Sequence, residues 1–497
     1  CNGLVNPDRS PHPAMAEVKY VHQNVGFEAT DIASGKFKIT NRFYFTNLKK
    51  YQIHYNVVAN NKIIRGGKVS LDIEPQASKE FTVPVNGLKA QPGVEYFVNF
   101  SVTSTEPEPL IPTGYEIAYD QFQLPVQAEK ETYKVSGPAL STSTQGDELI
   151  VSSSKVNFVF NKKSGLVTSY KVDGTEYFKD GFGIQPNFWR APNDNDYGNG
   201  APKRLQVWKE SSKNFHVTDV SMTNENKVVS LNATYLLAAG NLYIVTYKIY
   251  PSGVVNVNAK FTSTDMQAAE TEVSEATRMA TFTPGSDAAR KAASKLEVPR
   301  IGVRFRLSAQ MNNVQYFGRG PEENYIDRNH GTVVGVYKTT ADKMYFNYVR
   351  PQENGHRTDT RWIALSPDKG KGLVIVADSL VGFNALRNSI EDFDSEEALP
   401  HPYQWSNFTP EEVANHNEKA ARNVLRRMHH VNDITPRDFV EVCVDMKQQG
   451  VGGYDSWGSR PEPIYQIPAN REYNWGFTLV PVRSPGQANE AAKYDYR

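Results

Sequence analysis

The sequence has very little cysteine and no excess of charge of either sign. Cys1 and Cys443 are its only thiols, and 55 Lys and Arg residues balance 55 Asp and Glu residues. Two cysteines cannot build a disulfide framework, so the packing of apolar side chains must hold the chain together. A balanced charge argues against nucleic acid or an anionic membrane surface as the main partner.

Long apolar runs and a recognisable start are also missing. No apolar stretch approaches the length of a membrane-spanning helix, which argues against a membrane protein. The chain begins at Cys1 without a Met, and no basic and apolar leader follows. We therefore expect a piece of a longer polypeptide, and its compartment stays open between cytoplasm and periplasm.

Apolar and aromatic side chains are plentiful enough for large cores. Hydrophobic residues make up 39% of the chain and aromatic residues 11%, and Tyr (26) and Phe (24) dominate the aromatics. Such residues suit β-sheets and sugar-binding surfaces better than helical bundles. A chain of 497 residues exceeds one ordinary domain, so we expect about two to four domains.

Residues 1–25 differ in pattern from the rest of the chain. Apolar residues recur at helical spacing after Pro13, which predicts a helix over residues 14–21. A loop followed by one helix is typical of the last unit of an eight-stranded α/β barrel. Alone, such a unit cannot bury the apolar face of its helix.

Residues 26–127 alternate between polar and apolar side chains, the pattern of half-buried strands. Strands are predicted at 36–40, 43–45 and 51–58, and Asn60 with its neighbouring Asn marks a hairpin turn. About seven short strands in this region indicate an immunoglobulin-like β-sandwich. No cysteine pair supports this assignment, which depends on the strand pattern alone.

The remainder of the chain is again strand-rich. Residues 128–145 form a polar linker or a solvated edge strand, and residues 146–485 show no long helical pattern except near 411–424. An all-β region of this size is expected to fold as a large two-layer sandwich. The polar residues 486–497 are expected to fray.

The most distinctive stretch covers residues 188–198. Two aromatics, an Arg and a Pro lead into four alternating Asn and Asp residues, whose side chains can bond their own backbone. We predict a strand that ends at Trp189, followed by a rigid loop of the kind that carries binding residues. A calcium loop is the alternative, but the stretch lacks the remaining spaced ligands and the terminal Glu of an EF-hand.

Five motifs, in order along the chain, resemble the C-terminal part of the large bacterial β-galactosidases of glycoside hydrolase family 2. They lie in residues 2–14, 190–198, 316–328, 342–357 and 450–457. The resemblance implies an all-β chain: an immunoglobulin-like β-sandwich, then a large supersandwich related to galactose mutarotases, preceded by a short α/β remnant of a catalytic barrel. It also implies that the whole enzyme hydrolyses terminal β-galactosides with retention.

The same resemblance places the chemistry upstream of this chain. A retaining glycosidase needs two carboxylates about 5 Å apart. The family carries both Glu residues, together with its magnesium ligands, on earlier barrel strands, so no catalytic residue is expected here and the chain should be inactive alone. The implied partners are a β-galactoside, the upstream barrel of the same polypeptide and further copies in a homo-oligomer, and the implied cofactors are sodium and magnesium.

Three positions match functional residues of the family. Asn2 matches an asparagine that helps to bind sodium, Trp457 matches an apolar platform on which the sugar stacks, and Gly198 matches the hinge of a mobile loop. Each also has a plainer explanation: a loop Asn that bonds its own backbone, a core Trp and a turn glycine. The sequence departs from the family at Tyr454, where better-known homologues carry Asp, and in the shorter loop at 199–203.

Many charged residues invite a catalytic interpretation. We expect them instead to form Arg–carboxylate pairs and loop-bonding carboxylates that lock the long connections. They are Arg190, Asp194, Asp196, Arg319, Glu323, Asp327, Arg328, Glu353, Arg357 and Asp359.

Two other functions stay open. A carbohydrate-binding module would use Trp457 and nearby aromatics without turnover. An aldose epimerase would need a His acid and a carboxylate base that face each other across a cleft. His356 lies near Glu353 in the sequence, and His330 lies near Asp327.

Overall fold

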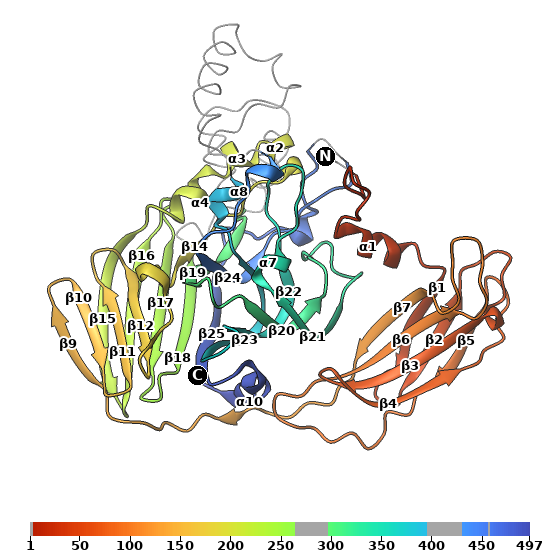
Figure 1. The fold of residues 1–497 in the computed structure, drawn as a ribbon, viewed down its shortest axis with the longest axis horizontal. Helices are drawn as coiled ribbons and strands as arrows, with labels where there is room; N and C mark the ends of the chain where they lie inside the picture. The colour runs from red at the N-terminus through yellow and green to blue at the C-terminus, as the bar shows by residue number, and fades with distance from the viewer. Residues whose placement is uncertain (1–2, 264–296, 395–429, 456–457) are drawn as a thin grey trace, which may run out of the picture.

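The computed structural model describes residues 3–263, 297–394, 430–455 and 458–497. Strands dominate, and they form two bodies of unequal size: a smaller sandwich drawn in red and orange, and a larger body that holds most of the other described residues (Figure 1). The all-β fold class predicted from the alternating pattern is confirmed. Among the residues described, no helix is long and apolar enough to cross a membrane.

The smaller body is a sandwich of two antiparallel sheets, as predicted. Phe27 stacks on Phe100 in its core with the ring centroids 4.5 Å apart. The predicted hairpin at Asn60 is confirmed, and Asn60 adopts a positive φ of 54° at the tight turn. One sheet has the order β1-β2-β5, with β1 (Val25–Asp31), β2 (Lys36–Asn41) and β5 (Ser78–Thr82). The other has the order β4-β3-β6-β7, with β3 (Tyr51–Ala59), β4 (Lys62–Val69), β6 (Tyr96–Ser104) and β7 (Glu116–Gln123).

The strand predicted at 43–45 is wrong. Strand β2 ends at Asn41, whose buried side chain accepts a hydrogen bond from Phe43 N (3.0 Å) and donates one to Thr46 O (2.9 Å). These bonds turn the chain, and Phe45 is 97% exposed at the turn. Adjacent aromatics favour a strand by local propensity, but here the Asn side chain satisfies backbone groups that a strand partner would have bonded.

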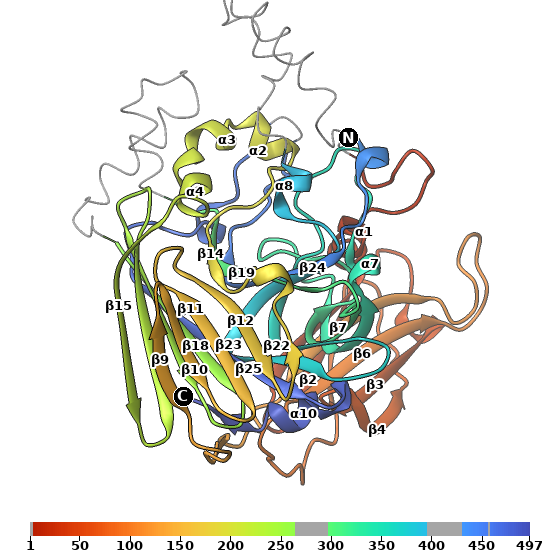
Figure 2. The same ribbon diagram turned by 60° about the vertical axis from the view of Figure 1, so that its left-hand side comes forward.

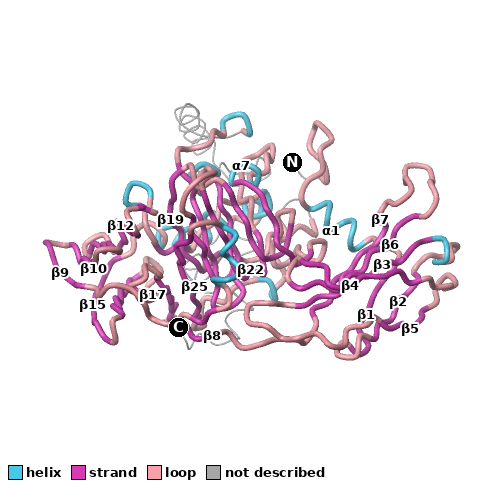
Figure 3. Tube along the Cα trace, turned by 60° about the horizontal axis from the view of Figure 1, so that its bottom comes forward, coloured by secondary structure: helices cyan, strands magenta, loops and turns pink. Residues whose placement is uncertain are grey.

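Helix α1 (Ala14–Val21) has the bounds predicted from the sequence. It lies at the junction of the two bodies, beside β7 (Figure 3). Tyr20 donates a hydrogen bond to Asp120 of β7 (3.3 Å), and Glu17 accepts one from Gly331 N of the larger body (2.7 Å). No residue of α1 is fully buried, so the helix touches both bodies without completing a core.

The larger body consists of two sheets packed face to face, which confirms the predicted two-layer sandwich. The five-stranded sheet lies against one end of the longer sheet (Figure 2). Phe158 of the shorter sheet meets Tyr247 of the longer one with ring centroids 5.7 Å apart in their common core. The shorter sheet contains β9 (Ser141–Gln145), β10 (Glu148–Ser152), β11 (Val156–Asn161), β12 (Leu166–Val172) and β13 (Thr175–Glu176).

The longer sheet contains twelve strands within the described residues. Its main path runs β14-β19-β24-β23-β25-β18-β17-β16-β15, and β22, β20 and β21 branch from β23. Burial alternates along β17, as the period of two in its sequence predicts. The strands are β14 (Gln185–Asn187), β15 (His216–Glu225), β16 (Val228–Leu236), β17 (Leu242–Ile249), β18 (Val255–Thr262), β19 (Arg300–Ser308), β20 (Asn313–Gly320), β21 (Val333–Thr340), β22 (Arg357–Ser366), β23 (Gly372–Leu386), β24 (Phe439–Gln448) and β25 (Tyr473–Val482).

Residues 486–497 do not fray, contrary to the prediction. Ala488 and Tyr496 are buried in an apolar cluster, and Tyr250 donates a hydrogen bond to Tyr496 O (2.7 Å). Sparse apolar residues among polar ones give no local signal, and only partners far away in the sequence bury them. The segment comprises η7 (Pro485–Gln487), α10 (Ala488–Ala491) and β26 (Tyr494–Asp495), which pairs in parallel with β8 (Glu131–Thr132).

Short helices connect many of the strands. Region 128–145 contains the exposed strand β9 at a sheet edge, in agreement with the predicted solvated edge strand. The helical pattern near 411–424 lies outside the described residues, and the domain boundaries stay predictions. The remaining helices in the described part of the chain are η1 (Leu48–Lys50), η2 (Lys179–Gly181), α2 (Asp194–Gly198), α3 (Ala201–Arg204), α4 (Gln206–Ser211), α7 (Ala341–Met344), α8 (Ile390–Phe393), η5 (Val431–Asp433) and η6 (Pro463–Tyr465).

Candidate functional site

The candidate site lies where two segments far apart in the sequence meet. We call residues 188–200 the α2 segment, and residues 449–455 with 458 and 459 the β24 loop. Asn193 of the first donates a hydrogen bond to Val451 O of the second (3.4 Å). The structure thus brings together the stretches around Gly198 and Trp457, although Trp457 itself and Asn2 lie outside the described residues.

The α2 segment is bonded to itself, as predicted, but as a short helix rather than a loop. Asn193 caps the helix, because its side-chain oxygen accepts from Asp196 N (2.8 Å) while the Asp196 carboxylate accepts from Asn193 N (3.2 Å). The preceding strand β14 ends before Trp189, at Asn187. Within the described part of the chain, no group of three or more His, Cys, Asp and Glu side chains could hold a metal ion, so the calcium alternative gains no support.

Arg190 joins the α2 segment to the β24 loop. Its guanidinium is 2% exposed and makes two hydrogen bonds with the Asp196 carboxylate (3.1 and 2.9 Å). The same group donates to the main-chain oxygens of Gln449 (2.8 Å) and Gly450 (3.0 Å). Burial lowers the pKa of Arg190, but the Asp196 carboxylate more than offsets this, so the side chain stays charged.

Three side chains bind the backbone of the β24 loop. Asp327 accepts hydrogen bonds from Val451 N (3.0 Å) and Gly452 N (2.9 Å). Ser459 Oγ accepts one from Gly453 N (3.1 Å), and Asp455 Oδ1 accepts one from Ser459 N (2.9 Å). The loop is therefore held by its own polar residues and by the connection that carries Asp327.

Gly198 is the last residue of α2, and it lies against the β24 loop. A Cβ atom at Gly458 would lie only 2.7 Å from the carbonyl carbon of Gly198, so the two backbones approach too closely for a side chain at 458. Within the α2 segment, the positive φ falls at Gly200 (71°), two residues after the predicted hinge. The hinge role of Gly198 stays a prediction, as do the platform role of Trp457 and the sodium ligand Asn2.

A buried cluster of charges lies beside the site. Arg300 forms ion pairs with Glu353 (3.1 Å) and Asp445 (3.2 Å), and it bonds the Gln448 side chain at the end of β24. Burial raises the pKa of Asp445 to about 7, although Arg300 opposes the shift. Sequence reasoning missed Arg300 and Asp445. The signal that could have found them is a charged residue at an inward position of an otherwise apolar strand.

His356 belongs to the same buried cluster. Its Nδ1 atom lies 3.8 Å from Asp445 Oδ2, and its ring stacks on Tyr325 with centroids 5.4 Å apart. Burial, followed by the charge of Arg300, holds the pKa of His356 well below its ordinary value. The side chain is 1% exposed, so no cleft separates it from the carboxylate, as an epimerase would require. The other pairing fails as well, because His330 lies near Glu17 (3.5 Å) rather than Asp327.

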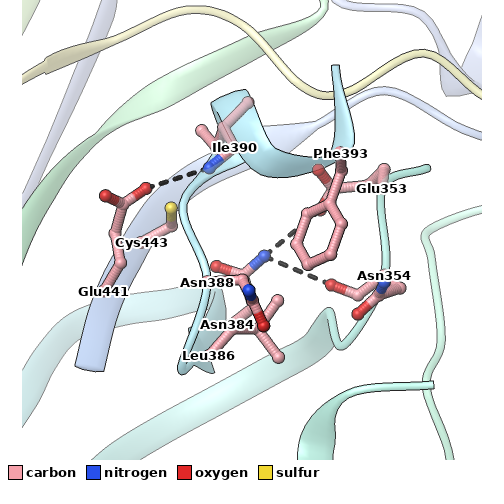
Figure 4. A pocket seen from close by; sticks show the side chains of 9 residues that line it. All are labelled: Glu353, Asn354, Asn384, Leu386, Asn388, Ile390, Phe393, Glu441 and Cys443. Atoms are coloured by element: carbon pink, nitrogen blue, oxygen red, sulfur yellow. Dashed lines mark hydrogen bonds between the residues drawn. The ribbon is translucent and has the colours of Figure 1, made fainter. Parts of the chain in front are cut away.

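A small cavity next to this cluster has a volume of about 10 Å³, room for about one water molecule and not for a sugar. Figure 4 shows Glu441 of β24 accepting a hydrogen bond from Ile390 N of α8 (3.2 Å) at one side of it. At the other side, Asn384 of β23 donates to Glu353 (3.3 Å). The Cys443 thiol that lines it is buried, and burial raises its pKa well above the ordinary value, which makes it unreactive.

Most of the charged residues singled out in the sequence form the predicted structural pairs. Arg357 departs from the prediction, because it donates to the Tyr316 hydroxyl (3.2 Å) and the Gly355 carbonyl (3.2 Å) rather than to a carboxylate. The remaining pairs are Arg190 with Asp196, Arg319 with Asp359, Arg328 with Glu323, Arg350 with Asp194 and Arg300 with Glu353, while Asp327 binds loop backbone.

A larger groove of about 1130 Å³ is lined by α1 together with residues of both bodies. Tyr119 of the smaller sandwich, Tyr337 of β21 and Phe346 contribute to its walls.

Comparison with known proteins gives consistent matches over nearly the whole chain. A family model described as "Beta galactosidase small chain" matches residues 152–479, and one described as "Beta-galactosidase, domain 4" matches residues 37–125. A β-galactosidase from Priestia megaterium is 30% identical over 484 residues, which are 97% of this chain and 41% of that protein. One from Streptococcus thermophilus is 24% identical over 487 residues, 97% of this chain and 40% of that protein. The chain thus spans about two fifths of the length of these relatives.

Among solved structures, a distant likeness in fold is found to sugar epimerases. A galactose 1-epimerase from Lactobacillus acidophilus superimposes with a TM-score of 0.35 and 6% identity, covering 71% of this chain and 100% of that one. A likeness at this level carries no argument about activity.

Proposed function

The chain belongs to the β-galactosidase small-chain family, and from this membership we propose that it is the C-terminal portion of a β-galactosidase. The observation that carries the proposal is the match of 97% of this chain to β-galactosidases of which it spans only 41%. The whole polypeptide hydrolyses terminal, non-reducing β-D-galactose residues with retention.

The proposal assigns the reacting carboxylates to the upstream barrel. Retaining glycosidases need a nucleophile and an acid/base about 5 Å apart. The buried carboxylates of the candidate site are engaged instead: Asp196 binds Arg190, and Glu353 and Asp445 surround Arg300. Carboxylates held this way stabilise loops, which supports a structural task for this portion of the enzyme.

This portion shapes the mouth of the active site. In the proposal, Trp457 supplies the apolar platform for the sugar, and Gly198 is the hinge of the neighbouring segment. The anchored backbone of the β24 loop on both sides of Trp457 supports this role, since a platform must be held in place. Asn2 contributes to a sodium site whose other ligands, like those of magnesium, come from upstream.

The main partner in this proposal is the upstream barrel, and further copies complete a homo-oligomer. Val21 of α1 is 58% exposed and Leu4 is 45% exposed, which is apolar surface that the rest of a barrel would cover.

The test compares hydrolysis of a chromogenic β-galactoside by the 497-residue chain alone and by the chain joined to its upstream barrel. We expect turnover only in the joined protein. There, Trp457→Ala should raise KM about tenfold, a loss of about 1.4 kcal/mol of binding, whereas Tyr44→Ala, at a side chain of the smaller sandwich that is 75% exposed, should change it little. Turnover by the chain alone would contradict the proposal. Galactose binding without turnover by either preparation would favour a binding module.

A further inference from the structure

The backbone at the start of the β24 loop is clamped by two oppositely charged side chains. Arg190 donates hydrogen bonds to the main-chain oxygens of Gln449 (2.8 Å) and Gly450 (3.0 Å). Asp327 accepts hydrogen bonds from the next two N–H groups, those of Val451 (3.0 Å) and Gly452 (2.9 Å). Four consecutive residues are thus bound: the first two through their carbonyl oxygens to Arg190, and the next two through their N–H groups to Asp327. Charge-assisted bonds of this kind are stronger and more directional than bonds between neutral groups.

Arg190 also fixes the position of the α2 segment. Two further N–H groups of Arg190 bond the Asp196 carboxylate, and Asp196 in turn closes the capping box at Asn193. The contact between the segments continues beyond Arg190, where the backbone of Gly458 lies directly on that of Gly198. The α2 segment and the β24 loop therefore share one buried guanidinium, the hydrogen bond from Asn193 to Val451 O (3.4 Å) and one backbone-to-backbone contact.

We propose that Arg190 and Asp327 are positioning residues for galactoside binding, which hold the α2 segment and the β24 loop as a single unit. This inference rests on the proposed function. Neither residue touches the reacting atoms: each acts through the main chain that presents the mouth of the site. A displacement of one segment must then be accompanied by a displacement of the other.

Arg190→Lys is the decisive variant, because Lys keeps the charge but cannot present the planar fork that reaches both segments. In the joined enzyme we expect KM for a chromogenic β-galactoside to rise about tenfold or more, with kcat within about twofold. Asp327→Asn should act in the same direction. The double variant should cost little more than either single one, since both changes release the same loop.

Arg361 provides a matched control away from the clamp. Its guanidinium also binds one carboxylate through two bonds, that of Glu95 (2.8 and 2.7 Å), and one main-chain oxygen, that of Asp359 (2.5 Å), but neither segment of the site nor the connection that carries Asp327. Arg361→Lys should therefore leave KM unchanged, even where it lowers thermal stability as much. Equal KM values in Arg190→Lys and Arg361→Lys would overturn the proposal.

Hydrogen exchange of the chain alone separates this inference from the proposed function. Arg190→Lys should speed exchange at least about tenfold both at 194–197 and at 449–452, because loss of the shared clamp loosens both segments. Arg361→Lys should leave both peptides protected. Faster exchange at 194–197 alone would overturn the coupling, whether or not the joined protein hydrolyses galactosides. Coupled exchange without turnover would instead contradict the proposed function and leave the coupling intact.

Discussion

Arg300 and Asp445 form an ion pair inside the larger body, with Nε 3.2 Å from Oδ2 and both side chains fully buried. They lie on the neighbouring strands β19 and β24. Glu353 is the second carboxylate on the same guanidinium, at 3.1 Å, and burial raises its pKa as well. One cation therefore faces two carboxylates, and the neutral His356 adds no compensating charge. Protonation of one carboxylate neutralises the excess negative charge and avoids the desolvation of a second buried anion.

The raised pKa of Asp445 predicts that its contribution to stability falls as the pH rises from about 4 to about 7. Burial raises this pKa from 3.8 to about 7, so within this window the folded state keeps the Asp445 proton that the unfolded state has released. The contribution of Asp445 to the free energy of unfolding should then fall by up to about 1.4 kcal/mol per pH unit and level off above the folded pKa. The lowered pKa of the buried His356 contributes with the opposite sign below its ordinary pKa, so the quantity to measure is the difference between two proteins. In urea unfolding at a series of pH values, the parent protein should lose stability relative to Asp445→Asn as the pH rises, whereas Asp438→Asn, at a carboxylate with 79% side-chain exposure, should follow the parent.

Arg300→Met should be among the most destabilising single changes in the chain. It leaves Asp445 and Glu353 buried without their cation, which costs about 3–5 kcal/mol when one partner of a buried pair is removed. The matched control is Arg497→Met, where the pair with Asp495 is exposed and contributes about 0–1 kcal/mol. Both values come from urea unfolding followed by tryptophan fluorescence. Similar losses in the two variants would show that the buried cluster does not depend on Arg300.

The C-terminal segment should be an integral part of the larger body. Ala488→Asp places a carboxylate in the apolar cluster around a residue that is 1% exposed, and it should cost at least about 2 kcal/mol. Asn489→Asp introduces the same group one residue later, on the exposed side, and should be nearly neutral. Thermal unfolding distinguishes the two. If both variants had the same melting temperature as the parent protein, the segment would not be packed as the structure shows.

The turn after β2 should depend on Asn41. Its buried side chain bonds Phe43 N, Thr46 O and Ile73 O, so Asn41→Ala leaves three backbone groups without their partner. We expect a loss of about 1–3 kcal/mol in the stability of the smaller sandwich. Asn86→Ala, at an exposed position, is the control and should change stability by less than about 0.5 kcal/mol. A neutral Asn41→Ala would mean that water replaces these bonds.

Several elements could be read from the sequence because their cause is local. Helix α1 begins after Pro13 and follows an apolar period of 3.6, and the structure gives the predicted bounds. The hairpin at Asn60 follows from an Asn pair between alternating strands. The rigidity of the α2 segment follows from Asn193 and Asp196, which bond each other three residues apart. In each case the partners are close enough in the sequence for spacing to reveal them.

Other features were hidden because the partner is distant. The aromatics at 43–45 suggest a strand until Asn41 is seen to bond Ile73, and the polar end of the chain suggests fraying until Tyr496 meets Tyr250. Of the predicted pairs, Arg328 and Glu323 are five residues apart, close enough for the sequence to suggest the pairing. Arg319 and Asp359 are forty residues apart, and only the fold brings them together.

The sequence by itself determined the all-β class, the helix after Pro13 and the motifs that resemble a β-galactosidase, since side-chain period and local motifs need no knowledge of the fold. The tertiary structure alone decided which charges meet. Arg190 reaches Gln449 across 259 positions, and Arg300 meets Asp445, only because strand order in the longer sheet places those segments side by side. Strand order depends on closing long loops and burying both sheet faces at once, and no short stretch of sequence carries that information.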